Sequence, residues 1–169
     1  MKVVDDGRGY LGEVAPRGLV RSHFPGGVKN VYVSTAKMGE VRAGHYHLKL
    51  IETFITVSGR ALWYFHDMRS RSKSQGATFG CLAGFSTEES SGLRMPIDVG
   101  FSEILVPSGV YHVFYALSPV TTVLAFASLG YDPKDYVRLE ATSFQEFSQM
   151  IKAVEDEAGI GWEGKGKSS

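Results

Sequence analysis

Short runs in which apolar and polar side chains alternate restrict the fold of this chain more than any other feature. The runs span residues 28–36, 53–57, 61–66, 103–106, 111–116 and 121–128. Side chains that alternate with a period of two predict β-strands with one buried face. Ser58-Gly59-Arg60 predicts a tight hairpin turn between two of the runs. Strands this short and closely spaced predict an all-β fold, an antiparallel sandwich or barrel.

One segment has a helical pattern instead. Ser143 and Glu146 have the spacing of a capping box. The apolar residues that follow at helical spacing are Phe144, Phe147, Ile151 and Val154, and Gly159 can end the helix. This pattern predicts one C-terminal α-helix that packs its apolar stripe on the outside of the sheet, and a dimer contact is the alternative.

Composition limits the classes of function. The chain has 169 residues, with 18 Lys plus Arg and 18 Asp plus Glu, so its formal charge is zero. A neutral chain lacks the basic field that nucleic acids require, and its apolar runs are far shorter than the ~20 residues that span a membrane. The single Cys81 excludes an internal disulfide framework and is typical of a cytoplasmic protein. No signal peptide is expected from the first residues.

The same reading gives the expected domain organisation. Residues 1–158 are predicted to form one domain. Within it, residues 69–100 are poor in large aliphatic side chains and are predicted to form a long exposed loop or lid near the mouth of the barrel. Residues 159–169 are small and polar and are predicted to be a flexible tail.

Three histidines and a glutamate carry the most specific signal. His45 and His47 share one face of a strand because they are two residues apart. Glu52 follows a short turn, and a hairpin return would bring it to the same point. His112 follows the turn Pro107-Ser108-Gly109 and is expected from the opposite sheet. Imidazole and carboxylate ligands suit zinc, iron, manganese or nickel, so these four residues are predicted to bind a divalent metal ion.

These residues give the chain a family resemblance. Gly39, five residues, His45-Tyr46-His47, four residues, Glu52, six residues and Gly59 match the first motif of the cupins. Pro107-x-Gly109-x-x-His112 resembles the second motif, with Ala116 where asparagine is usual. The resemblance implies a double-stranded β-helix, or jelly-roll barrel, with its site inside the mouth.

A narrower resemblance is to the nucleotide-sugar 3,5-epimerases and 3,4-ketoisomerases among the cupins. The segments that carry it are Asp6-Gly-Arg-Gly-Tyr-Leu-Gly-Glu13, Arg42-Ala-Gly-His45, Gly59 through Arg69, and Tyr131-Asp-Pro133-Lys-Asp-Tyr136. His45-Tyr-His47, Glu52-Thr-Phe54 and Tyr131-Asp-Pro133 are most similar to the C-terminal cupin of the bifunctional capsular-polysaccharide reductase/epimerase. The resemblance implies a nucleotide-sugar substrate and a role in polysaccharide or glycoside biosynthesis. The chain is also expected to form a homodimer.

Two departures affect the expected mechanism. The resemblance places His45 at the position of the 3,5-epimerase base, but Glu52 stands where those enzymes have lysine and Ala125 where they have a tyrosine acid. These differences argue against the metal-free mechanism and favour a metal-dependent one.

Four further residues are predicted to act on the substrate. Arg42 is predicted to pair with a pyrophosphate through its guanidinium, and Lys49 is predicted to contact a phosphate or sugar oxygen or to be a solvated turn residue. Tyr64 and His66 share a face and are the predicted acid and base residues beside His45, provided that this face lines the cavity.

The expected function is that of a metal-dependent epimerase or isomerase that acts on a nucleotide-linked 4-keto sugar. Two alternatives remain. An iron-dependent cupin dioxygenase could use the same ligands, and a sugar-binding cupin could bind the same ligand without turnover.

Overall fold

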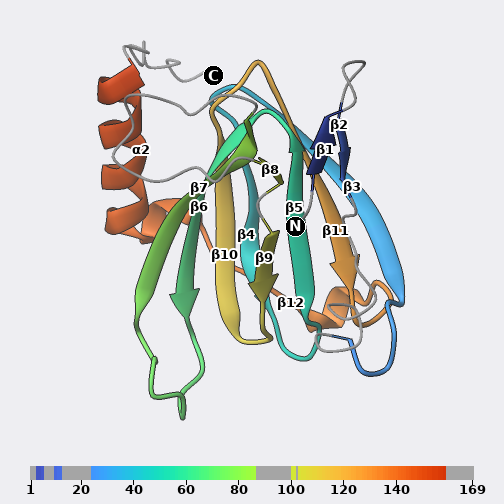
Figure 1. The fold of residues 1–169 in the computed structure, drawn as a ribbon. Coiled ribbons are helices and arrows are strands. Elements are labelled where there is room, and N and C mark those ends of the chain that lie inside the picture. Colours follow the sequence, from blue (N-terminus) through green and yellow to red (C-terminus); the bar gives the residue numbers. More distant parts are fainter. Residues whose placement is uncertain (1–2, 6–9, 13–23, 87–99, 102, 159–169) are drawn as a thin grey trace, which may run out of the picture.

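Two antiparallel sheets face each other in this computed structural model, which describes residues 3–5, 10–12, 24–86, 100–101 and 103–158 (Figure 1). The strands of the two main sheets are β3 (Asn30–Lys37), β4 (Val41–His47), β5 (Glu52–Ser58), β6 (Arg60–Asp67), β7 (Thr78–Ser86), β8 (Gly100–Phe101), β9 (Glu103–Val106), β10 (Val110–Ala116), β11 (Val120–Ala127) and β12 (Tyr136–Arg138). One sheet has the order β12-β4-β10-β6-β7-β8 and the other the order β3-β11-β5-β9. A separate two-stranded hairpin pairs β1 (Val3–Asp5) with β2 (Tyr10–Gly12).

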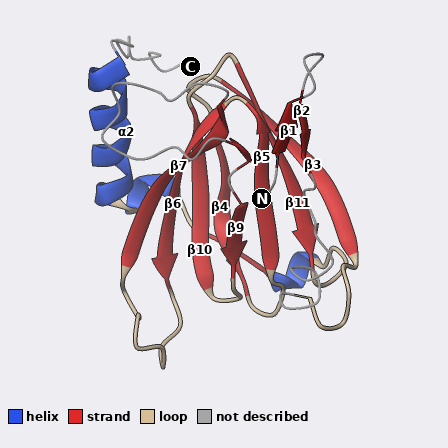
Figure 2. Cartoon of the chain, viewed as in Figure 1, coloured by secondary structure: helices blue, strands red, loops and turns tan. Residues whose placement is uncertain are grey.

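Among the described residues after β11, three segments are helical, and one of them is an α-helix (Figure 2). Two short 3₁₀ segments, η1 (Pro133–Asp135) and η2 (Ala141–Ser143), flank β12, and α2 (Gln145–Ala158) follows. The helix begins two residues after Ser143, because η2 occupies the predicted cap. Among the described residues, no helix is long and apolar enough to cross a membrane.

The core between the two sheets is built from inward-facing side chains of both. Phe54, Trp63, Phe114 and Val123 are all buried in this cluster. The alternation that predicted the strands continues here, since Tyr32 faces inward while Val31 and Val33 are exposed on the other side of β3. The double-sheet jelly-roll barrel that the sequence predicted is therefore the fold of this chain.

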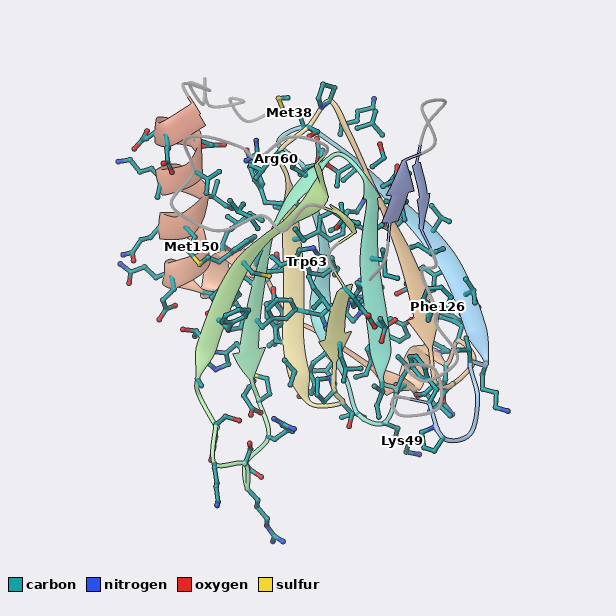
Figure 3. The ribbon with its side chains drawn as sticks, in the orientation of Figure 1. Met38, Lys49, Arg60, Trp63, Phe126 and Met150 are labelled. Carbon is teal, nitrogen blue, oxygen red and sulfur yellow. The ribbon has the colours of Figure 1, made fainter. Side chains whose placement is uncertain are left out.

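A second core lies on the outer face of the six-stranded sheet, under α2. Phe147 and Val154 of the helix pack against Tyr64, Tyr111 and other outward-facing residues of β6 and β10. Figure 3 shows Met150 between the helix and the sheet and Trp63 among the strands. The predicted packing of the helix on the outside of the sheet is confirmed.

The predicted long loop is wrong for Thr78–Ser86, which form β7 in the six-stranded sheet. The glycines of this segment are typical of loops, but antiparallel pairing with β6 holds it in a strand. A Cβ at Gly80 would lie 1.8 Å from the terminal methyl of Met150, so this glycine leaves the space that the Met150 side chain of α2 occupies. The exposed residues 68–77 join β6 to β7, whereas the predicted lid at 87–99 and the tail at 159–169 lie outside the described residues.

Candidate metal centre and active site

Four buried side chains meet between the two sheets. One ligand atom from each of His45, His47, Glu52 and His112 lies within 4.8 Å of the others. The Nε2 atoms of His45 and His47 are 3.2 Å apart, and Oε2 of Glu52 is 3.0 Å from Nε2 of His47 and 3.5 Å from Nε2 of His112. The structure thus brings together the four residues that the sequence predicted as metal ligands.

The elements that supply these residues differ in part from the prediction. His112 on β10 lies directly opposite His45 on β4, so all three histidines come from the six-stranded sheet. Glu52 is the residue that comes from the facing sheet, at the start of β5. The predicted hairpin return for Glu52 and the opposite-sheet origin of His112 are therefore wrong. The physical reason is that residues 48–51 form a corner that carries the chain from one sheet to the other.

Hydrogen bonds at the far side of two imidazoles orient their Nε2 atoms. Nδ1 of His47 lies 3.2 Å from Oδ2 of Asp135, and Nδ1 of His112 lies 3.2 Å from the carbonyl oxygen of Val110. Both acceptors require Nδ1 to carry the hydrogen, so in the neutral rings the lone pair sits on Nε2 and points into the cluster. A histidine held in this way by a carboxylate or carbonyl is the usual arrangement around a protein-bound metal ion.

The pKa values of His45, His112 and Glu52 favour the protonation states that bind metal ions. Burial lowers the pKa of His112 to about 3, and burial followed by the neighbouring His47 lowers the pKa of His45. Burial alone would raise the pKa of Glu52, but its contacts with His47, His112 and Tyr32 outweigh this effect and hold the pKa below its ordinary value. Neutral imidazoles and an ionised carboxylate are the forms that bind metal ions.

A cavity of about 570 Å³ opens beside the cluster. Its inner wall is aromatic, formed in part by Phe54, Trp63 and Phe114. Two arginines, Arg42 and Arg138, line it as well, and among the described residues neither has an ion-pair partner. The cavity therefore combines a metal-type donor set, an apolar wall and two guanidinium groups.

A bulge in β4 explains why Arg42 lines the cavity. The register with β10 pairs His112 with His45 and then Val113 with Ala43, so Gly44 has no partner. Ala43 and Gly44 both have positive φ, 70° and 73°. The extra residue places Arg42 opposite the inward-facing Phe114. Arg42 therefore lines the cavity because of a local change in the strand.

The segment after the barrel contributes residues that sequence reasoning did not select. β12 pairs with β4, so that Tyr136 lies opposite His47 and Arg138 opposite His45. The Tyr136 ring centroid lies 4.9 Å from that of His45 and 4.3 Å from that of His47. Buried Asp135 accepts hydrogen bonds from the backbone N–H groups of Lys49 and Leu50, in addition to its contact with His47. The resemblance of Tyr131–Tyr136 to the family is the sequence feature that could have identified these residues.

Tyr32 is a further residue that the prediction left out. Its hydroxyl donates a hydrogen bond of 2.6 Å to Oε1 of Glu52. Burial and the carboxylate of Glu52 raise the pKa of Tyr32, so the phenol stays protonated at neutral pH. The alternation placed Tyr32 on the face opposite Val31 and Val33 but did not show which face is inward, and its pairing with Glu52 depends on the sheet order β3-β11-β5.

Three predicted residues lie away from the cluster. Tyr64 and His66 are on the outer face of β6, where the ring centroids lie 5.5 Å and 5.3 Å from that of Phe144. Their assignment as acid and base residues is corrected, because Trp63 and Phe65 occupy the inner face of this strand. Lys49 is exposed in the corner between β4 and β5, where Figure 3 labels it, and is not among the residues that line the cavity. It is a solvated turn residue, the alternative to its predicted substrate contact.

Comparisons with known proteins show the fold. No protein-family model and no curated protein matches this sequence. Among solved structures, a 4-keto-6-deoxy sugar epimerase from the novobiocin cluster of Streptomyces spheroides is 17% identical, with a TM-score of 0.68 over 94% of this chain and 83% of that one. The 3′-monoepimerase from Streptomyces bikiniensis, in complex with dTDP-quinovose, is 18% identical, with a TM-score of 0.67 over 99% and 75% of the two chains.

A third structure is also similar. The dTDP-6-deoxy-D-glucose-3,5-epimerase from Legionella pneumophila, in complex with dTDP-4-keto-L-rhamnose, is 18% identical, with a TM-score of 0.65 over 83% of this chain and 70% of that one.

Proposed function

We propose that this protein is a metal-dependent epimerase or isomerase of a nucleotide-linked 4-keto sugar. The observation that carries the proposal is the convergence of His45, His47, Glu52 and His112 at a cavity lined by two arginines without ion-pair partners among the described residues. The fold, shared with epimerases that act on dTDP-linked keto sugars, supports the same substrate class.

The donor set fits a divalent cation. Nε2 of His47 and Oε2 of Glu52 lie 3.0 Å apart, and the hydrogen bond to Asp135 supports a lone pair on that nitrogen. Nε2 of His112 is buried and has no hydrogen-bond partner among the described residues. Electron-rich atoms this close are stabilised by a cation among them. Three imidazoles and a carboxylate suit zinc, iron, manganese or nickel. Such an ion would polarise the ketone and stabilise the negative charge that develops on its oxygen.

The protein's own groups would bind the substrate and move its protons. Arg42 and Arg138 are placed to pair with the diphosphate, and the exposed ring of Tyr131 offers a stacking surface at the same cavity. Tyr136 contacts the rings of His45 and His47. Burial, followed by Glu52, raises the pKa of Tyr136, so its phenol is protonated at neutral pH and can return a proton to the substrate carbon.

Two roles are open to His45, which lines the cavity and is the most exposed of the three cluster histidines at 8%. As a fourth ligand it completes the metal site, and as a neutral imidazole it accepts the proton from the carbon beside the ketone. A His45→Ala variant separates them. Lost turnover with unchanged metal content assigns His45 as the base, whereas loss of both assigns it as a ligand.

The test of the function is solvent deuterium incorporation. Each member of a panel of nucleotide-linked 4-keto sugars is incubated with metal-loaded protein in D₂O. We expect deuterium at a carbon next to the ketone and a change in configuration or in carbonyl position. Binding without deuterium entry would favour the sugar-binding alternative. Oxygen uptake by an iron-loaded sample would favour the dioxygenase.

We further propose a cytoplasmic homodimer. The single Cys81 supports the reducing compartment. Val31 and Val33 are 52% and 61% exposed on the outer face of β3, which supports burial against a second copy. Light scattering of the purified chain measures the mass of the assembly.

A further inference from the structure

We propose that Tyr32 is a positioning residue that fixes the carboxylate of Glu52, and that Ala125 leaves the space in which the Tyr32 side chain lies. The inference rests on the proposed metal site. It assigns a specific task in that site to two residues from strands β3 and β11.

The geometry of the Glu52 carboxylate supports the role of Tyr32. Glu52 is 1% exposed, and its two oxygens have different neighbours. Oε1 accepts the hydrogen bond from the Tyr32 hydroxyl at 2.6 Å, while Oε2 lies 3.0 Å from Nε2 of His47. The hydrogen bond restricts rotation of the carboxylate and directs Oε2 toward the histidines. Groups that orient a ligand in this way typically change metal affinity by about 10–100-fold when they are removed.

The register of the four-stranded sheet supports the role of Ala125. Ala125 lies opposite Tyr32 on β3 and opposite Phe54 on β5. The three residues form a row across the inner face of the sheet, in which a small residue separates two aromatic ones. Directly opposed Cβ atoms are about 4.5–5.5 Å apart. Ala125 is fully buried, so a larger side chain at this position would compete with the Tyr32 ring for the same space.

The structure contains a matched control for this pair. On the outer face of the other sheet, the hydroxyl of Tyr115 donates to the carboxylate of buried Glu155, which anchors α2. Both contacts join a tyrosine to a carboxylate, but only the Tyr32 contact reaches the histidine cluster. Comparing the two tyrosines therefore separates the loss of a hydroxyl from the loss of a metal-site contact.

The experiment measures zinc affinity of the full chain by competition with a chromophoric chelator. Tyr32→Phe is expected to weaken binding by about 10–100-fold, and Tyr115→Phe to leave it unchanged. Ala125→Val, which retains the hydroxyl but crowds the ring, is expected to weaken binding in the same direction. It replaces Tyr32→Phe if that variant does not fold. Saturating metal should restore turnover of Tyr32→Phe, because a positioning residue acts through ligand binding.

The outcomes are distinct. If wild type binds zinc and Tyr32→Phe, or Ala125→Val in its place, binds it equally well, the Tyr32 assignment is overturned while the proposed metal site stands. If weakened binding is accompanied by turnover that saturating metal does not restore, the positioning role is overturned in favour of direct contact with the substrate. If wild type binds no divalent ion, the metal-dependent function fails together with this inference.

Discussion

The six-stranded sheet buries both of its faces, but the two faces hold different chemistry. On the inner face, His45, His47 and His112 crowd around Glu52. On the outer face, aromatic residues of the sheet pack against Phe147 of α2. Both regions contain a tyrosine that donates to a buried carboxylate, yet one pair serves the cluster and the other anchors a helix. Burial of a polar pair alone therefore does not identify a site.

The difference between the faces lies in how closely ligand-type nitrogen and oxygen atoms crowd together. On the outer face, the carboxylate of Glu155 meets one phenol at the side of an apolar helix contact. On the inner face, three imidazoles approach one carboxylate, and two of them direct ring lone pairs toward it. Such crowding is unfavourable without a cation, whereas the outer face needs none. Variants of the inner face should change binding and turnover, and variants of the outer face should change stability.

The largest expected effect is that of His47→Ala. Loss of the His47 imidazole removes one proposed metal ligand, which is also the contact partner of Glu52 and of Asp135. We expect metal content and turnover to fall together, by about 100-fold or more. The barrel should remain folded, because the apolar cores bury most of the surface. Metal analysis, turnover and circular dichroism on one preparation test this. Retained turnover without metal would contradict it.

The opposite face should respond to Phe147→Ala. Phe147 is 1% exposed, and its ring centroid lies 5.5 Å from that of Tyr64. Truncation of a buried phenylalanine typically costs about 3–5 kcal/mol in the free energy of unfolding. Urea denaturation measures the loss, and metal affinity of the folded fraction should not change. A fall in metal affinity would show that the two faces are coupled.

A smaller effect is expected from Asp135→Asn, which keeps the shape of the residue but removes its charge. Asp135 is held by the corner that carries the chain to Glu52, and it accepts from Nδ1 of His47. Weakening this hydrogen bond should lower metal affinity by about tenfold, within the range for residues that orient ligands. Chelator competition measures it. Lys134→Gln, an exposed neighbour, is the control and should bind as wild type does.

A further expected effect is a dependence of the free energy of unfolding on pH in the metal-free protein. The folded state lowers the pKa of His45 and His112, the latter to about 3, while the unfolded chain takes up these protons near pH 6.5. Stability is therefore complete above about pH 6.5 and falls as the pH drops toward 3. Each histidine contributes at most about 1.4 kcal/mol per pH unit. Urea midpoints from pH 7.5 to 4.5 measure the slope, and His112→Asn should reduce it.

The sequence predicts those features of this molecule that depend on residues close together in the chain. Short alternating runs predicted the main strands, and the spacing of His45, His47 and Glu52 predicted that they meet, because both depend on positions close in the chain. The fold and the central residues of the site could thus be predicted from the sequence. Strand β7 could not be predicted in this way, because the contact between Gly80 and Met150 forms only when the helix packs on the sheet.

The rest of the site depends on contacts between distant segments. Tyr64 and His66 could not be assigned to a face, since α2 covers the outer side and makes both sides of β6 apolar. Asp135 and Tyr136 join the cluster through the pairing of β12 with β4, which local sequence does not encode. Tyr32 reaches Glu52 across an intervening strand. These residues become visible only when strand order and register are known.

The most direct test of the account is the metal content of the purified wild-type chain, followed by turnover before and after chelation with a nucleotide-linked 4-keto sugar that is a substrate. The account predicts one divalent ion per chain, loss of deuterium incorporation when the ion is removed, and recovery when it is returned. A metal-free sample that retains full activity would contradict the account. His45 would then be the base of a metal-free reaction.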